Sequence, residues 1–210
     1  KLYYRELVAR FGHHLALNWN LGEENTNTDA QRKQFTQWLA DHDPYRHLVV
    51  VHTYPGQKDQ VYQPMLGSAS ELTGASLQCG PTSVFGDTLT WRNRSAAAGK
   101  AWVVANDEQG NANAGIRPDA DDPTHDASRR DVLWGHLTAG GAGVESYFGY
   151  RYAHSDLTCQ DWRSRDVWWD QCRHALTLLR TGRVPFQDMA NRDALLRSVP
   201  SGSHCLAGSR

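Results

Sequence analysis

The feature of the sequence that most constrains its fold is a repeated alternation of strand-like and helix-like segments. The strand-like segments are Leu15–Leu21, His47–Thr53, Gly74–Gln78, Ala101–Asp107 and Val144–Tyr147. The helix-like segments are Leu2–Gly12, Thr28–Asp41, Ser83–Ala98, Arg129–Ala139 and Arg163–Thr181. Helical segments repeat their apolar residues every three or four positions, whereas His47–Thr53 is a continuous apolar run. Such alternation predicts βαβ units with right-handed crossovers and a parallel sheet.

The carboxyl ends of the predicted strands carry polar and acidic residues. They are Glu23, Glu24, His52, Gln78, Asp107, Glu108 and Glu145. A (β/α)8 barrel places its active site at the carboxyl ends of its strands. A nucleotide-binding open sheet would instead show a Gly-rich phosphate loop after a strand, and the sequence contains neither G-x-G-x-x-G nor a P-loop. The Gly-rich run at 140–143 precedes a strand, so a tight turn is its expected role. We therefore predict an α/β fold of the (β/α)8 TIM-barrel type.

Composition excludes some classes of partner. The chain has 22 Lys and Arg against 23 Asp and Glu, a formal net charge of −1, so it has no basic surplus for nucleic acid or an anionic membrane. No apolar run approaches the roughly 20 residues that cross a bilayer. We predict a protein that binds neither nucleic acid nor membrane.

Two groups of metal or disulfide candidates have weak sequence support. The four cysteines lack a CxxC or a paired Cys/His spacing, which argues against structural zinc, although Cys159 and Cys172 are a candidate pair. An acidic loop offers oxygen ligands for calcium through Asp119, Asp121, Asp122 and Asp126. The loop lacks the EF-hand spacing, so we interpret it as a solvated loop.

Two carboxylates at strand ends point to glycoside hydrolysis. Parallel barrel strands deliver their last residues to one rim, so Glu24 and Glu108 can face each other although they are far apart in the sequence. A retaining glycosidase needs two carboxyl groups about 5 Å apart, and an inverting enzyme needs about 6.5–9.5 Å to admit water. The alternative is structural, because Glu24 can belong to a solvated loop before a helix and Glu108 to a turn after a strand.

The residues around these carboxylates resemble a known family. Trp19-Asn20-Leu21-Gly22-Glu23-Glu24-Asn25 resembles the fourth-strand motif of clan A glycoside hydrolases, in which a Trp precedes the acid/base Glu by five positions. Glu24 stands at that position, and Glu23 stands where the family usually has an Asn that binds the sugar 2-hydroxyl. The segment 102–110 resembles the seventh strand, whose terminal Glu, here Glu108, is the nucleophile.

Two later segments extend the resemblance. Residues 134–137 and 139–150 are similar to the helix and the eighth strand of bacterial barrel glycosidases described as carrying a collagen-binding domain. The resemblance implies strands four to eight of a barrel over residues 1–198, with the first three βα units missing, and the start of a C-terminal β-domain over residues 199–210. Together with a first residue that is not Met, this leads us to expect a fragment or a processed form. We also expect an extracellular or periplasmic location.

The expected function is hydrolysis of an O-glycosidic bond in a poly- or oligosaccharide, with Glu24 as acid/base, Glu108 as nucleophile and no cofactor. Expected substrate-binding residues are Trp19, Glu23, His52, Tyr54, Gln78, Asp107, Trp134, Glu145, Tyr147 and Tyr150. Glu145 and Asp107 are also rivals for the nucleophile, and core packing is the default role for Trp134. Two other functions stay open. One is a non-catalytic carbohydrate-binding barrel protein, and the other is a metal-dependent hydrolase, which the missing His-x-His strand end disfavours.

Overall fold

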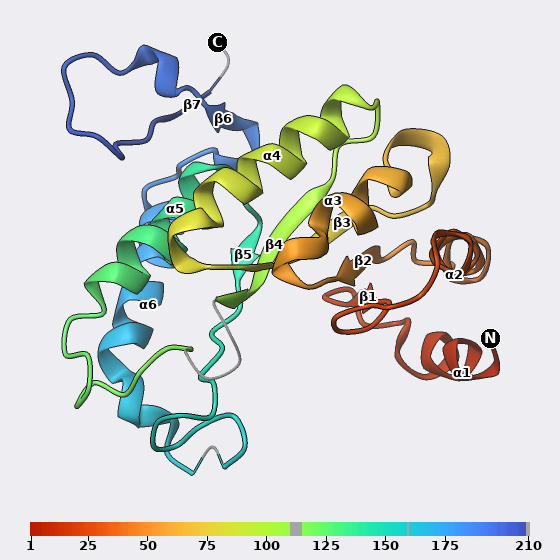
Figure 1. Cartoon of the computed structure of the whole chain (residues 1–210), viewed down its shortest axis with the longest axis horizontal. Coiled ribbons are helices and arrows are strands. Elements are labelled where there is room, and N and C mark those ends of the chain that lie inside the picture. The colour runs from red at the N-terminus through yellow and green to blue at the C-terminus, as the bar shows by residue number, and fades with distance from the viewer. Residues whose placement is uncertain (110–114, 159, 209–210) are drawn as a thin grey trace. The chain divides into compact units, whose positions relative to one another are not determined.

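The structure is a computed structural model that describes residues 1–109, 115–158 and 160–208. It is an α/β fold with a five-stranded parallel sheet flanked by helices (Figure 1), as the alternation in the sequence predicts. Neighbouring strands of the sheet follow the chain order β1-β2-β3-β4-β5. The strands are β1 (Asn18–Asn20), β2 (Leu48–His52), β3 (Gly74–Cys79), β4 (Val103–Gln109) and β5 (Gly143–Val144). The helices are α1 (Leu2–Phe11), α2 (Asp29–His42), α3 (Lys58–Tyr62), α4 (Val84–Ala97), α5 (Gly135–Thr138) and α6 (Asp166–Thr181).

The chain divides into two compact units. The first unit comprises Lys1–Gln78 and Thr90–Ala105, and the second comprises Cys79–Leu89 and Asn106–Arg210. The strand β4 and the helix α4 each contribute residues to both units.

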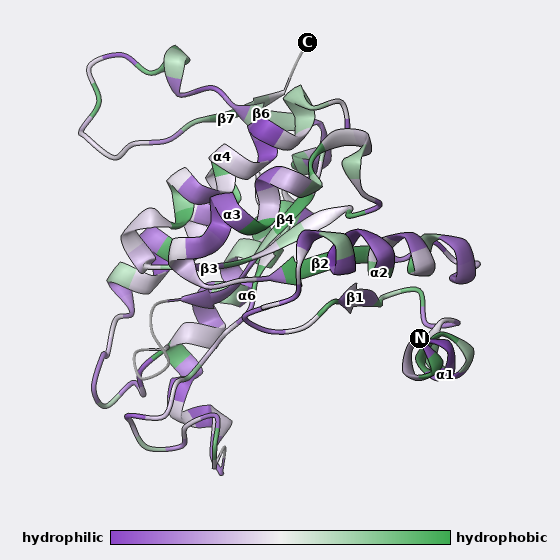
Figure 2. Cartoon of the chain, turned by 45° about the vertical axis from the view of Figure 1, so that its right-hand side comes forward, coloured by the Kyte–Doolittle hydropathy of each residue, from purple (hydrophilic) through white to green (hydrophobic). Residues whose placement is uncertain are grey.

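In the first unit, the predicted strand at 47–53 and the helix at 28–41 are confirmed. Hydrophobic residues follow one another along β2, whereas hydrophilic and hydrophobic residues alternate along α2 (Figure 2). The Thr28 side chain accepts the Gln31 backbone N–H at 3.3 Å, and the Gln31 side chain accepts the Thr28 backbone N–H at 2.9 Å. This capping box fixes the start of α2 because it satisfies two otherwise unpaired N–H groups.

Three segments of the first unit differ in detail from what the sequence predicts. The strand expected over 15–21 is limited to β1, Asn18–Asn20. The segment after β2, for which no element was predicted, contains α3 and short 3-10 turns. The amphipathic helix α1 is present, but it has no fully buried residue and Tyr3 is exposed. Instead the ring of Tyr4 lies 5.6 Å from that of Phe35 on α2.

The core of the first unit lies on one face of the sheet. Parallel pairing sets Trp19 beside Val49 and Val51 beside Ala75, and all four side chains are buried. The α3 residue Tyr62 packs on this face, and its hydroxyl donates to the carbonyls of β2 and β3 at Val51 (3.0 Å) and Ser76 (2.8 Å). Two further tryptophans complete this core, Trp91 and Trp102.

The second unit has its own core around α6. It consists of Ile116, Leu133, Leu137, Phe148, Trp168 and Ala175. The Arg165 guanidinium is fully buried beside it, 4.1 Å from the centre of the Phe148 ring. Arg165 donates to the carbonyls of Ile116 (2.9 Å), His154 (3.0 Å) and Ala153 (3.2 Å). One side chain therefore links loops that are distant in the sequence.

Several elements of the second unit differ from expectation. The predicted helix 129–139 is a π-helix over Ser128–Trp134 that continues into α5. The eighth-strand segment pairs over Gly143–Val144 alone. Near the C-terminus, β6 (Met189–Asn191) and β7 (Leu206–Gly208) form an antiparallel pair. The sequence predicts β-structure after residue 199, where β7 lies, and gives no signal for β6.

The backbone of the Gly-rich run at 140–143 lies close to the ring of a buried histidine, as a tight turn and not as a phosphate loop. A Cβ atom at Gly141 would lie 2.1 Å from Nε2 of the fully buried His136. His136 Nε2 accepts the Gly143 N–H at 3.3 Å, and its Nδ1 contacts the Thr88 hydroxyl at 2.8 Å. Glycine is needed at position 141 because the imidazole occupies the space of a side chain.

Candidate functional site

The first unit places polar side chains, most of them buried, toward the carboxyl ends of three neighbouring parallel strands. Side chains alternate between the two faces of a strand, so Asn20 and His52 lie on the face opposite the apolar core. Ser76 pairs with His52 in the register, and Gln78 follows it by two positions on the same face. The other face is apolar and covered by α3. These polar side chains therefore all lie on one face of the sheet.

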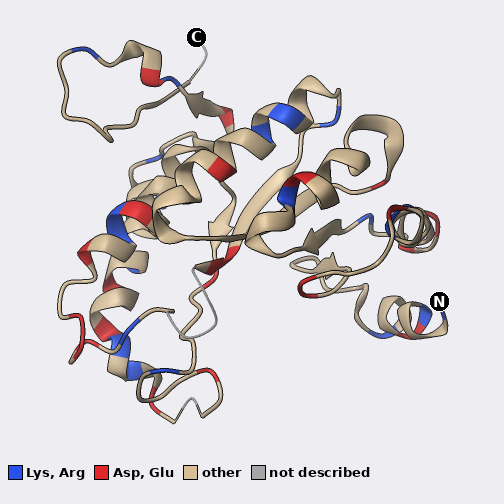
Figure 3. Ribbon diagram, in the orientation of Figure 1, with Lys and Arg blue, Asp and Glu red and all other residues tan. Residues whose placement is uncertain are grey.

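The loop after β1 holds two carboxylates, Glu23 and Glu24, and Figure 3 shows the acidic residues of this loop. Asn25 fixes the loop by donating its backbone N–H to the His52 carbonyl at 3.0 Å and its side-chain amide to the Leu21 carbonyl at 3.1 Å. The buried Arg32 of α2 donates to the Asn25 side-chain oxygen at 3.0 Å and to its carbonyl at 3.1 Å. The carboxylates therefore stand on a loop that is bonded to both β2 and α2.

Glu23 is exposed but held by two partners. The Asn20 amide donates to its Oε1 at 2.9 Å, and Nδ1 of the fully buried His52 lies 3.4 Å from its Oε2. The same His52 Nδ1 lies 3.1 Å from the Ser76 hydroxyl oxygen. A carboxylate oxygen and an imidazole nitrogen are both ligand types for a divalent metal.

Glu24 has an unusual backbone and a phenol partner. Its φ of 41° lies in the left-handed region, which costs a non-glycine residue of order 1–3 kcal/mol and recurs at functional sites. The carboxylate accepts a hydrogen bond from Tyr54, and this bond with the Glu24 charge raises the pKa of the Tyr54 phenol above its ordinary value. The structure thus brings Glu23, Glu24, His52 and Tyr54 together.

Gln78 lies at the end of β3, next to this group in the strand order. Its side chain is 4% exposed, and its Oε1 has no hydrogen-bond partner among residues 1–109, 115–158 and 160–208. A buried acceptor without a partner costs of order 1–3 kcal/mol. A ligand hydroxyl is the type of donor that would satisfy it.

In the second unit, Asp107 and Glu108 lie inside β4 rather than after it, and both are half-buried. The buried Gln109 donates its amide to the Asn106 side-chain oxygen at 3.1 Å and to the Glu145 carbonyl at 2.6 Å. The Glu145 backbone N–H donates to the Asn106 carbonyl at 2.9 Å. Glu108 and Glu145 are therefore carried by adjoining backbone segments of one unit. The pairing of Glu108 with Glu24 remains a prediction, because the two belong to different units.

The predicted aromatic contacts fall into two groups. Tyr150 is exposed and Tyr147 is half-buried, so both have surface to offer. Trp134 packs against the core of the second unit, its default role. Trp19 is 5% exposed, and its indole N–H donates to Asp43 Oδ2 at 2.9 Å. Trp19 therefore supports the strand from the core face.

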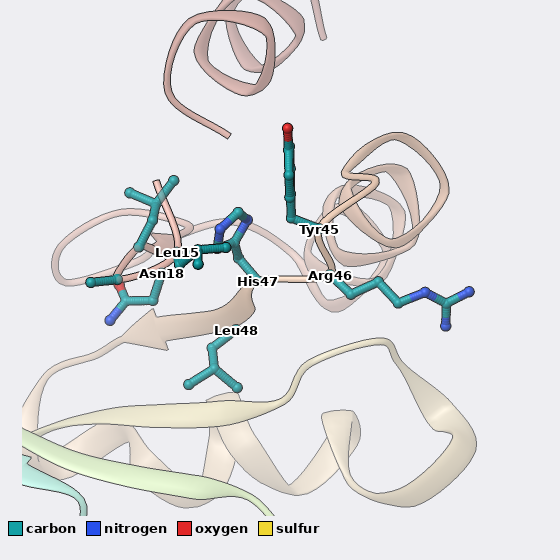
Figure 4. A pocket seen from close by; sticks show the side chains of 8 residues that line it. Leu15, Asn18, Tyr45, Arg46, His47 and Leu48 are labelled. Carbon is teal, nitrogen blue, oxygen red and sulfur yellow. The ribbon is translucent and has the colours of Figure 1, made fainter. Parts of the chain in front are cut away.

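A second polar cluster lies at the opposite, amino ends of β1 and β2. His47 Nδ1 contacts Asp43 Oδ2 at 2.7 Å, and its Nε2 contacts the His14 carbonyl at 2.9 Å. Burial alone would raise the pKa of Asp43, but hydrogen bonds from Trp19 and His47 hold that pKa below its ordinary value. A pocket of about 410 Å³ opens here (Figure 4), in which the Arg46 side chain points away from the His47 ring. Because it lies at the amino ends of the strands, this pocket is separate from the carboxylate cluster.

Sequence reasoning missed Asn20, Asn25, Arg32 and Ser76, which position the carboxylates and His52. Asn20 and Asn25 flank the acidic pair in the sequence, which is a weak signal. Arg32 and Ser76 act through long-range hydrogen bonds that leave no periodic pattern. Cys172 is a free thiol whose pKa burial raises to about 11, and its candidate partner Cys159 lies outside the described residues.

Comparison with known proteins gives no family for this chain. No family model, no curated protein and no solved structure matches it. Among the residues that the structure describes, no helix has the length and apolar character needed to cross a membrane.

Proposed function

We propose that the chain is part of a (β/α)8-barrel glycoside hydrolase that cleaves an O-glycosidic bond with two carboxylates. The observation that carries the proposal is the Glu24–Tyr54 pair, held beside Glu23 and His52 at the carboxyl ends of parallel strands. A carboxylate on a fixed loop beside a phenol, with an unsatisfied amide acceptor at Gln78 on the neighbouring strand β3, suits a substrate rich in hydroxyl groups.

The strand order supports the barrel part of the proposal. Each strand pairs with the next one along the chain, and the order never reverses. A doubly wound open sheet reverses its strand order at the point where it binds ligands, whereas a barrel adds its strands in one direction. We propose that the strands here correspond to strands four to eight of such a barrel.

In the proposed reaction, Glu24 protonates the leaving oxygen while Glu108 attacks the anomeric carbon, and Glu24 then deprotonates the water that releases the sugar. Glu24 must alternate between its two protonation states. The Tyr54 hydroxyl serves both, because it donates to the ionised carboxylate and can accept from the protonated one. Retention of configuration is the expected outcome.

A second candidate is a carbohydrate-binding protein without catalysis. The observation that favours it is Glu23, which stands where the resembled family has an Asn and which is held by Asn20 and His52. A carboxylate there cannot donate a hydrogen bond to a sugar 2-hydroxyl when it is ionised.

The test uses the full chain, a panel of aryl glycosides and polysaccharides, and the variants Glu24→Gln and Glu108→Gln. Loss of a general acid/base is expected to lower the rate about 10²- to 10⁴-fold. The control is Glu6→Gln, an exposed residue of α1 paired with Arg10. Unchanged turnover in either site variant would refute that residue's role. Retained oligosaccharide binding with no turnover in any form would favour the binding protein, and chelator-sensitive turnover would favour a metal-dependent hydrolase.

A further inference from the structure

The loop that precedes the π-helix of the second unit contains a buried histidine between two aspartates. His125 is fully buried, and its Nε2 lies 2.7 Å from Oδ1 of Asp119. An ionised carboxylate accepts hydrogen bonds and does not donate them, so this contact requires the proton on Nε2. The lone pair of the neutral ring is then on Nδ1.

Both carboxylate oxygens of Asp119 accept hydrogen bonds, which fix the orientation of its side chain. Its second oxygen, Oδ2, accepts the Val167 backbone N–H at 3.1 Å in the first turn of α6. Asp119 therefore fixes both the orientation and the tautomer of the imidazole. Carboxylates play this part behind metal-binding histidines, where they orient the ring and make the free nitrogen more basic.

The other ring nitrogen of His125 lacks a partner. Within the described part of the chain, Nδ1 is buried and makes no hydrogen bond. It faces Oδ2 of Asp122 across 3.9 Å, too far for a hydrogen bond. The other oxygen of Asp122 accepts the His125 backbone N–H at 3.1 Å, so this carboxylate is also held in place. The Nδ1 lone pair and the Asp122 carboxylate face each other, so both can bind a cation that lies between them.

The gap fits a small transition-metal ion. Typical zinc bonds are about 2.0–2.1 Å to imidazole nitrogen and about 2.0–2.2 Å to carboxylate oxygen, so two ligand atoms of one tetrahedral ion lie roughly 3.4 Å apart and at most about 4 Å apart. The 3.9 Å between Nδ1 and Oδ2 is within this limit, and a small inward movement of Asp122 gives the tetrahedral distance. The Asp122 side chain is 28% exposed, which leaves the outer side of the ion open to water. The nearby Arg129 does not compete, because its guanidinium contacts Asp126 at 2.7 Å.

We propose that His125 Nδ1 and the Asp122 carboxylate bind one divalent transition-metal ion such as Zn²⁺, with Asp119 as the orienting carboxylate. The imidazole ligand distinguishes this site from the calcium loop that the acidic residues alone would indicate, because Ca²⁺ prefers oxygen ligands. The bound ion would link the loop to the start of α6 through Asp119.

The test is a Zn²⁺ titration of the metal-stripped chain by calorimetry, with the ring nitrogens of His125 followed by NMR. The background carries His13→Gln and His14→Gln, since these two exposed rings lie 4.0 Å apart and can bind metal adventitiously. Asp122→Asn keeps the oxygen that accepts the His125 N–H and removes the negative ligand. It is expected to weaken one equivalent of Zn²⁺ binding by about 10- to 100-fold. Asp126→Asn, in the same loop, is the matched control and is expected to bind as the parent does.

Support consists of one equivalent lost in Asp122→Asn, a Zn²⁺-dependent shift of the His125 Nδ1 resonance, and no competition by Ca²⁺. If His125→Gln folds, it should lose the same equivalent. If His125→Gln does not fold, the proposal is judged by the Zn²⁺ binding of Asp122→Asn and by the shift of the His125 Nδ1 resonance. An unmoved Nδ1 resonance, or equal Zn²⁺ binding in the parent and in Asp122→Asn, would mean adventitious binding elsewhere and would overturn the proposal.

Discussion

The hydrogen bond between Tyr54 and Glu24 makes the ionisation of one residue depend on the other. The pKa of Tyr54 is raised first by the hydrogen bond to Glu24 and then by the charge of that carboxylate. Glu24→Gln removes the charge and replaces a strong acceptor with a weak one. We expect the pKa of Tyr54 to fall toward 10.0 in this variant, as measured by NMR titration of the phenol ring. Glu23→Gln should leave the titration unchanged, and an equal shift in both variants would contradict the pairing.

The carboxyl group of Asp43 makes the free energy of unfolding depend on pH. Its pKa is lower in the folded chain than its ordinary value of 3.8, because hydrogen bonds from Trp19 and His47 outweigh the effect of burial. A depressed carboxyl pKa stabilises the fold at pH values above the unfolded pKa, and this contribution is lost as the pH falls through the folded value. Asp43→Asn is therefore expected to destabilise the chain by about 3 kcal/mol at pH 7.

The difference between Asp43→Asn and the parent should narrow as the pH falls below 3.8, because the unfolded carboxyl then takes up a proton while the folded carboxyl, with its lower pKa, is still ionised. Urea unfolding at pH 7 and pH 3 measures both values. Asp41→Asn is the control, since Asp41 lies two residues before Asp43 in the last turn of α2, is exposed, and accepts a hydrogen bond from the exposed Gln37 side chain. A destabilisation that is independent of pH would show that Asp43 acts through packing alone.

At the scale of elements, the turn between α5 and β5 depends on the fit of one glycine against an imidazole. Gly141→Ala would place a methyl group in the space of the His136 ring, and overpacking of this kind costs about 1–3 kcal/mol. Gly143→Ala is a matched control in the same run, because a Cβ there meets no atom within 4 Å. Urea unfolding should show a large loss for position 141 and a change within about 0.5 kcal/mol for position 143. Equal losses would point to backbone entropy instead.

The sequence predicted those elements whose signal is local. The continuous apolar run of β2 and the Thr28 cap of α2 are legible in short windows, and both are confirmed. The helix α3, with the sequence KDQVY, is too short and polar to show a period, and tertiary burial of Val61 and Tyr62 stabilises it. The strand β6 is also too short to show a period in the sequence, because it has only three residues and forms by pairing with β7.

Of the candidate site, the sequence could predict the residues that lie at strand ends, because a strand end is also a local signal. The rule that parallel strands end at one edge correctly gathered Glu23, Glu24, His52 and Tyr54. The same rule could not find Arg32, which acts from a helix, or show that Trp19 faces the core. Hydrogen bonds between distant residues leave no mark on composition or spacing.

For the whole molecule, near-zero charge governs behaviour in solution. The formal net charge is −1 at pH 7, and a chain so close to neutrality gains net positive charge at pH 5.5 and net negative charge at pH 9. Mutual repulsion between molecules is therefore smallest near neutral pH, and we expect the lowest solubility there. Precipitation by polyethylene glycol at pH 5.5, 7 and 9 measures it. Lower solubility at pH 5.5 than at pH 7 would show that surface patches outweigh net charge.

The buried Arg165 has a consequence for the order in which the second unit can be completed during synthesis. The carbonyl of Ile116 leaves the ribosome 49 residues before the arginine that binds it. At about 5–20 residues per second, that is a delay of roughly 2–10 s before Arg165 can bind the Ile116 carbonyl. The loops that Arg165 links therefore reach their final bonding only once this residue, directly before α6, has emerged. A nascent chain stopped before residue 165 would carry these loops in an open, protease-sensitive form.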